Sequence, residues 1–171
     1  MTIYLILSTV LLISFVTDIK ERKILNIVTF PAILFGLIYH SILNGMSGIA
    51  YSGLGFLLGF GLLLVPFLLG GMGAGDVKLM AAIGALTGMN FTLQAFVFIA
   101  LIGGGISILL IIKQKGLINS VRSSIYMIPF LRSNIGSNII KKNNYSSISF
   151  PYGVAIVLGT ISAIVWGGGL S

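Results

Sequence analysis

The sequence predicts an all-α, polytopic membrane protein with about six transmembrane helices, and two observations carry that prediction. Of the 171 residues, 57% are hydrophobic and only 8% are charged, whereas an ordinary soluble domain carries about 25% charged residues. The mean hydropathy is +1.12. A water-exposed surface cannot be built from this composition. The length allows a single membrane-embedded domain, residues 1–171, and no sizeable soluble one.

A helix needs roughly 20 apolar residues to cross the hydrocarbon core, with a range of about 17–25. The expected spans are residues 1–17, 27–43, 48–69, 77–86, 91–112 and 151–168. The first span has no basic region before it and no clean small-residue cleavage site after it, so it predicts a spanning helix and not a cleaved signal. The fourth span has only about ten residues, and a re-entrant segment is the alternative there.

The basic residues set the expected orientation. Nine lie in the loops after the first and fifth spans, at Lys20, Arg22, Lys23, Lys113, Lys115, Arg122, Arg132, Lys141 and Lys142, and Lys78 ends the loop after the third span, just inside the fourth. With six spans these segments share one side of the membrane, which the positive-inside rule assigns to the cytoplasm. We therefore expect both termini outside and a long basic cytoplasmic loop before the last helix.

Several classes of site and partner are disfavoured by composition. The chain has no cysteine, which excludes a disulfide framework, a thiolate nucleophile and a Cys-based metal site. A single histidine, His40, disfavours a His-rich metal site and is better interpreted as hydrogen-bonded packing. We expect no metal and no other cofactor. Topology explains the net charge of +7 more simply than a nucleic-acid partner does.

Only three residues are acidic: Asp18, Glu21 and Asp76. Asp18 closes the first expected span and Asp76 opens the fourth, so both are expected at the inner membrane surface, on different helices that can meet. Two adjacent carboxyl groups cannot both ionise cheaply, so the pair shares one proton near neutral pH. One then serves as general base toward water and the other as general acid toward a carbonyl, with the roles belonging to the pair. Glu21 is interpreted as a solvated loop charge.

Simpler interpretations of these residues stay open. Asp76 follows a glycine and precedes an apolar helix, so it could cap that helix; Asp18 could balance the basic loop that follows it. The flanking Gly73 and Gly75 permit positive φ values or close backbone approach, and a plain cap needs neither. Lys78 could stabilise an ionised aspartate or anchor in lipid headgroups.

Gly55 and Gly59 are four residues apart in the third expected span. This spacing of small residues favours close contact between helices.

The stretch "GAGDVKLMAAIGA" around Asp76 resembles the GxGD signature of the type IV prepilin peptidases. The first aspartate of that family precedes a basic stretch ending in Ile-Pro-Asn. Asp18 is followed here by "IKERKILN", which matches except that leucine replaces the proline. The family's late Pro-aromatic-Gly element resembles "FPYGVAI". The resemblance covers nearly the whole chain.

The resemblance implies an intramembrane-type aspartyl endopeptidase with Asp18 and Asp76 as catalytic residues. The matching residues taken as supporting are Asn26, Gly73, Gly75, Lys78, Pro151, Tyr152 and Gly153. Its substrates would be pilin-like or pseudopilin precursors, cut between a short basic leader and the hydrophobic N-terminal helix. The cysteine-free chain resembles the short, peptidase-only type without a methyltransferase domain. The implied location is the cytoplasmic membrane of a prokaryote, with the active site facing the cytoplasm.

Two other classes compete with a protease. A small transporter subunit would also use intramembrane acids, but near mid-bilayer, whereas both aspartates here fall at span ends. A non-catalytic membrane component of a pilus or secretion machine could keep the fold and lose the chemistry. The presence of both aspartates favours the enzyme.

Overall fold

The computed structural model describes residues 2–21, 23–113 and 152–167, and its regular elements there are all helices. These are α1 (Thr2–Glu21), α2 (Asn26–Leu68), α3 (Ala74–Lys113) and α5 (Tyr152–Trp166). In the described ranges, α1, α2 and α3 as far as Leu109 are long and apolar enough to cross a membrane, and α5 is a shorter apolar helix. Most of the predicted basic loop, with Pro151, lies outside the described residues.

The chain divides into two compact units. The first comprises Met1–Gly103 and Phe150–Ser171, and the second comprises Gly104–Ser149. The first unit holds α1, α2, most of α3 and α5, together with both aspartates singled out in the sequence. All contacts discussed below lie within it.

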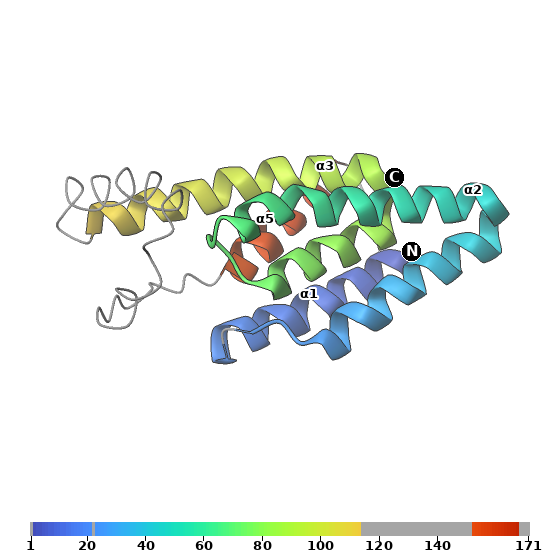
Figure 1. Ribbon diagram of the computed structural model, residues 1–171, viewed down its shortest axis with the longest axis horizontal. Helices are drawn as coiled ribbons and strands as arrows, with labels where there is room; N and C mark the ends of the chain where they lie inside the picture. Colours follow the sequence, from blue (N-terminus) through green and yellow to red (C-terminus); the bar gives the residue numbers. More distant parts are fainter. Residues whose placement is uncertain (1, 22, 114–151, 168–171) are drawn as a thin grey trace, which may run out of the picture. The chain divides into compact units, whose positions relative to one another are not determined.

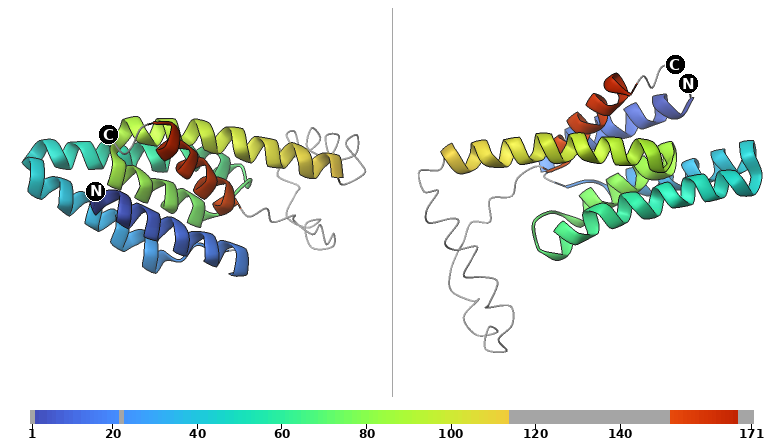
Figure 2. Two further views of the ribbon diagram at one scale, coloured as in Figure 1. Left: turned by 180° about the vertical axis from the view of Figure 1, so that it is seen from behind. Right: turned by 90° about the horizontal axis from the view of Figure 1, so that it is seen from above.

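Each of the two longest helices is interrupted by one glycine. Gly45 in α2 has φ 57° and ψ −133°, and Gly88 in α3 has φ 77° and ψ 177°. Both helices double back at these residues (Figures 1 and 2). The two breaks fall in the predicted gaps between the second and third and between the fourth and fifth spans. The helical segments thus agree with the predicted pattern, while the number that crosses a membrane stays a prediction.

The end of α1 differs from the expected one. The helix continues to Glu21, about one turn beyond the predicted end at residue 17, so Asp18 lies inside its last turn. Lys20, in that same turn, favours the extension because a cation stabilises the negative end of the helix dipole. The connection from α1 to α2 is therefore short, spanning residues 22–25.

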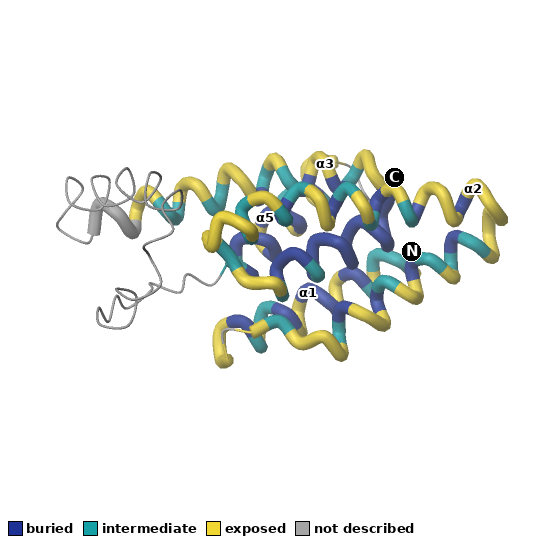
Figure 3. Tube along the Cα trace, viewed as in Figure 1, coloured by how far each residue is buried: buried dark blue, intermediate teal, exposed yellow. Residues whose placement is uncertain are grey.

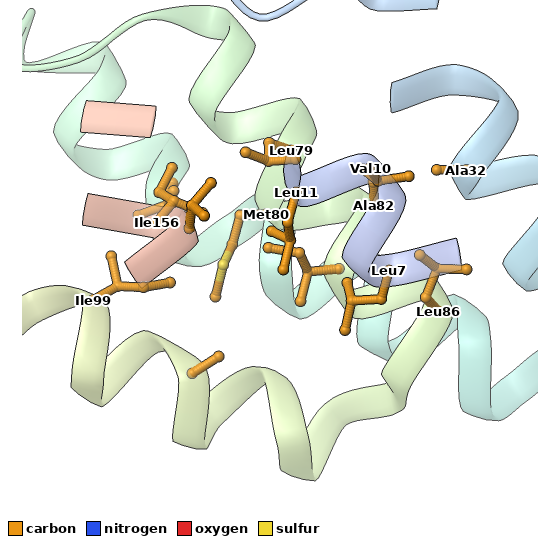
Figure 4. Packing of buried hydrophobic residues seen from close by; sticks show 14 of the residues in the cluster. Leu7, Val10, Leu11, Ala32, Leu79, Met80, Ala82, Leu86, Ile99 and Ile156 are labelled. Carbon is orange, nitrogen blue, oxygen red and sulfur yellow. The ribbon is translucent and has the colours of Figure 1, made fainter. Parts of the chain in front are cut away.

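The first half of α3, residues 74–87, is the most buried helical segment of this unit. Its residues from Leu79 to Leu86 are buried without exception, as the dark tube in Figure 3 shows. Leu7 and Leu11 of α1 and Ile156 of α5 belong to the same apolar cluster (Figure 4). The segment predicted with least support, the fourth span, is thus a helix surrounded by protein. That surrounding explains why it is apolar on every face.

Small residues let α2 lie directly against this buried helix. A methyl group at Gly36 would lie 2.6 Å from the carbonyl oxygen of Ala85. One at Gly55 or Gly59 would overlap the backbone of the same helix at Gly84 or Met80. The close helix contact predicted from the Gly55 and Gly59 spacing is confirmed. It brings both halves of α2 against the helix that carries Asp76.

Candidate active site

A cavity of about 240 Å³ opens where α1 ends and α3 begins. Its lining comes from the last turn of α1, the connection to α2 and the glycine-rich start of α3: Asp18, Lys23, Ile24, Gly73, Ala74, Gly75 and Asp76. Two of the three acidic residues in the chain therefore face one small space, although they lie on different helices.

Asp18 is buried, with 5% of its surface exposed. Its Oδ2 atom accepts a hydrogen bond of 3.2 Å from the backbone N–H of Val154, in the first turn of α5. Gly153, also buried, lies directly against the carboxyl group: a methyl group there would lie 2.6 Å from Oδ2 of Asp18. The late glycine of the sequence motif is thus brought to the first aspartate.

Asp76 is buried to a similar degree, with 7% exposure. It is the third residue of α3, and its Oδ2 atom accepts a 3.0 Å hydrogen bond from the backbone N–H of Gly73, just before the helix. This satisfies a donor that the helix start leaves free, as the third residue of a capping box does. The capping alternative is therefore correct in part. A carboxylate has acceptor sites on two oxygens, so capping leaves it able to act in the cavity.

Gly75 lies close to Ile24, in the connection after α1. A methyl group at Gly75 would lie 3.0 Å from Cβ of Ile24. The described glycines with positive φ are Gly45, Gly70 and Gly88, so the alternative of a positive φ at Gly73 or Gly75 is wrong. The missing side chain at Gly75 allows Ile24 to lie against the start of α3, where Lys23 and Ile24 line the cavity.

Lys78 has a partner that the sequence did not indicate. Its Nζ atom donates a 2.9 Å hydrogen bond to Oδ1 of Asn26, the first residue of α2, and lies 5.5 Å from the centroid of the Phe30 ring. The bond ties the start of α3 to the start of α2. Two supporting residues of the sequence motifs are thereby brought together beside the cavity, and the connection carrying Ile24 is held at its far end.

Three further residues considered in the sequence, Tyr152, Glu21 and His40, lie in helices α5, α1 and α2. Tyr152 begins α5 and is half-buried. Glu21 is exposed in the last turn of α1 and is not part of the cavity lining, which agrees with a solvated charge. His40 is buried, and its Nε2 atom lies 3.0 Å from the carbonyl oxygen of Leu86, so the predicted hydrogen-bonded packing is confirmed.

Four contributors to the site were not predicted. Lys23, Ile24 and Ala74 line the cavity, and the donor to Asp18 is the backbone N–H of Val154. The position of Lys23 and Ile24 between Asp18 and Asn26, two residues that the motifs matched, was an available signal. Val154 had none, because a backbone donor leaves no trace in residue type.

This arrangement suits acid–base chemistry on a water molecule. Two carboxyl groups that line one small, largely buried space ionise together only at high cost. The cavity volume leaves room for a water molecule, whose share of liquid volume is about 30 Å³.

A comparison with models of protein families shows which family this chain belongs to. The model of the type IV leader peptidase family matches residues 5–108, more than half of the chain. The chain belongs to the type IV leader peptidase family. Within this leader peptidase family member, the matched range includes both cavity carboxyl groups and ends before α5. The resemblance drawn from the GxGD motif and the upstream aspartate is therefore confirmed.

A curated relative agrees with this assignment over part of the chain. The preflagellin peptidase of Methanocaldococcus jannaschii is 40% identical over 80 residues, which are 44% of this chain and 34% of that protein. The matched stretch thus spans about a third of the relative's length. No solved structure gives a significant match to this leader peptidase family member.

Proposed function

We propose that this chain is an aspartic endopeptidase that removes the short basic leader from prepilin-like or pseudopilin precursors. One observation carries the proposal: Asp18 and Asp76 line the same cavity. Both carboxyl groups are buried, and each is held through one oxygen by a backbone N–H. Membership of the type IV leader peptidase family supports the reaction class.

In the proposed reaction the ionised carboxyl group takes a proton from a water molecule held between the pair. The resulting hydroxide attacks the carbonyl carbon of the scissile peptide bond, while the protonated carboxyl group donates its proton to the carbonyl oxygen. The carboxyl group that took the water proton then protonates the amide nitrogen, and the other, now ionised, takes a proton from a hydroxyl of the tetrahedral intermediate as the C–N bond breaks. The pair is again singly protonated, so the reaction consumes only water.

We place the active site at the cytoplasmic face of a prokaryotic cell membrane. The support comes from charge: Lys20 and Lys23 follow Asp18 in sequence and Lys78 follows Asp76. Under the positive-inside rule these cations mark the cytoplasmic end of their helices. A substrate whose basic leader stays in the cytoplasm, with its apolar helix in the bilayer, would present the junction between them at this depth.

The proposal is tested with Asp18→Asn and Asp76→Asn, each co-expressed with a prepilin-like precursor. Asparagine keeps the shape of the side chain but cannot exchange a proton. We expect each variant to insert in the membrane and to lose cleavage, scored by precursor mobility on a gel. Glu21→Gln is the matched control, because Glu21 is an exposed acid one turn away; it should cleave at the wild-type rate.

Retained processing in either asparagine variant would refute the proposed pair. A wild-type protein that inserts correctly and cleaves no precursor, in cells or after purification, would instead favour a non-catalytic component of a pilus or secretion machine. A small transporter subunit, the third class considered, would show proton or solute flux in sealed vesicles that depends on the same two aspartates.

A further inference from the structure

The carboxyl group of Asp18 is held by a helix other than its own. Asp18 lies in the last turn of α1, and its Oδ2 atom accepts the hydrogen bond from Val154 in the first turn of α5. The first backbone N–H groups of a helix have no partner within that helix. The start of α5 therefore supplies a free donor, and it carries the positive end of the helix dipole.

This contact requires glycine at position 153. A methyl group there would lie 2.6 Å from Oδ2, 2.7 Å from Cγ and 3.1 Å from Cβ of Asp18. The first two distances are under 3.0 Å, which real Cβ atoms essentially never show, so either the carboxyl group or the start of α5 would have to shift. Asp18 is 5% exposed, and a short side chain packed that tightly has little room to shift without losing the Val154 bond.

We infer that Gly153 and the backbone N–H of Val154 position the Asp18 carboxyl group for catalysis. The inference rests on the proposed function and extends it to α5, which lies outside the part of the chain matched by the family model. Gly153 acts by allowing close approach, and Val154 acts by donating to Oδ2. With Oδ2 held in this way, the second oxygen of Asp18 is the one that reaches the water shared with Asp76.

The main test compares turnover with stability in glycine-to-alanine variants. Gly153→Ala should lower kcat for precursor cleavage by about tenfold to a hundredfold, because displacing a reacting group by about 1 Å has an effect of that size. KM should stay within about twofold, because the change acts on the chemical step. Cleavage by the purified full-length protein, with a synthetic precursor peptide in detergent, gives both constants.

Two controls separate positioning from general damage to α5. A methyl group at Gly159, on the same helix, would lie 2.6 Å from the backbone nitrogen of Ile99, equally crowded but away from Asp18. Gly159→Ala should lower the melting temperature at least as much as Gly153→Ala, with a smaller loss of kcat. A methyl group at Gly61 would meet nothing within 4 Å, so Gly61→Ala should leave kcat unchanged and should not lower the melting temperature.

A second pair of variants removes the donor alone. Val154→Pro deletes the N–H, and proline is tolerated in the first turn of a helix because that N–H has no helical partner. Val154→Ala shortens the side chain and keeps the donor. We expect the kcat of Val154→Ala to be at least about ten times that of Val154→Pro. This comparison tests the positioning of Asp18 without adding an atom that crowds it.

The inference is overturned if Gly153→Ala and Val154→Pro both keep the wild-type kcat while Asp18→Asn is inactive. It is also overturned if kcat falls in Gly159→Ala as far as in Gly153→Ala at the same loss of stability. If Asp18→Asn itself cleaves normally, the proposed function fails. If Gly153→Ala does not fold, the comparison of Val154→Pro with Val154→Ala decides the matter.

Discussion

The Nε2 atom of His40 lies 3.0 Å from the carbonyl oxygen of Leu86, two residues before α3 breaks at Gly88. Ser52 donates to the preceding carbonyl, of Ala85, at 2.7 Å, and Tyr51 donates to the following one, of Thr87. The last carbonyls of a helical segment lack amide donors from the next turn. Three side chains of α2 thus cap the far end of the buried helix that starts at the cavity.

Removing one member of this cap should destabilise the protein. His40→Ala leaves the Leu86 carbonyl without that donor in a buried place, which costs about 1–3 kcal/mol. For a chain of this size that is a fall of roughly 2–10 °C in melting temperature, measurable by thermal unfolding in detergent. Ser8→Ala is the control, because the Ser8 hydroxyl is exposed and bonds a carbonyl of its own helix. Equal melting temperatures for the two variants would contradict the role of the cap.

Gly88→Ala should be among the most damaging single-methyl changes in α3. At φ 77° and ψ 177°, Gly88 occupies a region that is essentially confined to glycine, with a cost of about 1–3 kcal/mol for other residues. The added methyl group would also overlap the Tyr51 ring.

Gly45→Ala separates the two causes, because Gly45 also has a positive φ but has open space around it. We expect the order of melting temperatures to be Gly53→Ala highest, then Gly45→Ala, then Gly88→Ala, since a methyl group at Gly53 meets nothing within 4 Å. A Gly88→Ala protein as stable as the Gly53→Ala protein would show that the break at residue 88 needs no glycine.

The bond between Lys78 and Asn26 predicts coupling between the starts of α3 and α2. Lys78→Met keeps an apolar side chain of similar length and removes the donor together with the charge near the Phe30 ring. Asn26→Ala removes the acceptor. Because the pair is exposed, the coupling free energy in a double-mutant cycle should be small, about 0.5 kcal/mol. Thermal or denaturant unfolding of the four proteins measures it, and strictly additive effects would show that the bond contributes nothing.

Cleavage should show a bell-shaped dependence on pH. If Asp18 and Asp76 act with one shared proton, kcat falls at low pH, where both carboxyl groups are protonated and no base remains. It falls at high pH, where both are ionised and no acid remains. A profile of kcat from pH 4 to about pH 10 measures both limbs. Glu21→Gln should keep both limbs, and a profile that rises to a plateau without a second limb would argue against the shared proton.

Much of the helical pattern was predictable because it follows from apolar run length and from glycine. The breaks at Gly45 and Gly88 fall in the predicted gaps, and α5 begins within one residue of the predicted start of the last span. The end of α1 was misplaced by about one turn, because a helix that carries Asp18 and Lys20 continues past the end of its apolar run. Hydropathy marks the apolar run and does not mark the end of the helix.

The two carboxyl groups were predictable because acids are so rare in this chain. Their surroundings were not. The donors to Asp18 and Asp76 are backbone N–H groups, which every residue except proline carries. The Lys78 partner depended on α2 returning beside the start of α3, and the cap formed by Ser52, Tyr51 and His40 depended on the same packing. Both are tertiary relationships between residues that look unremarkable in sequence.

The hydrogen bond from Val154 to Asp18 has a consequence for biosynthesis. A ribosome makes the two ends of this contact 136 residues apart, with all of α2 and α3 between them. The carboxyl group of Asp18 thus gains its partner only after the last helix has emerged and docked on α1. Before that point a nascent chain carries both aspartates but lacks the Val154 donor to Asp18, so under the proposed function full activity would be delayed until α5 is translated.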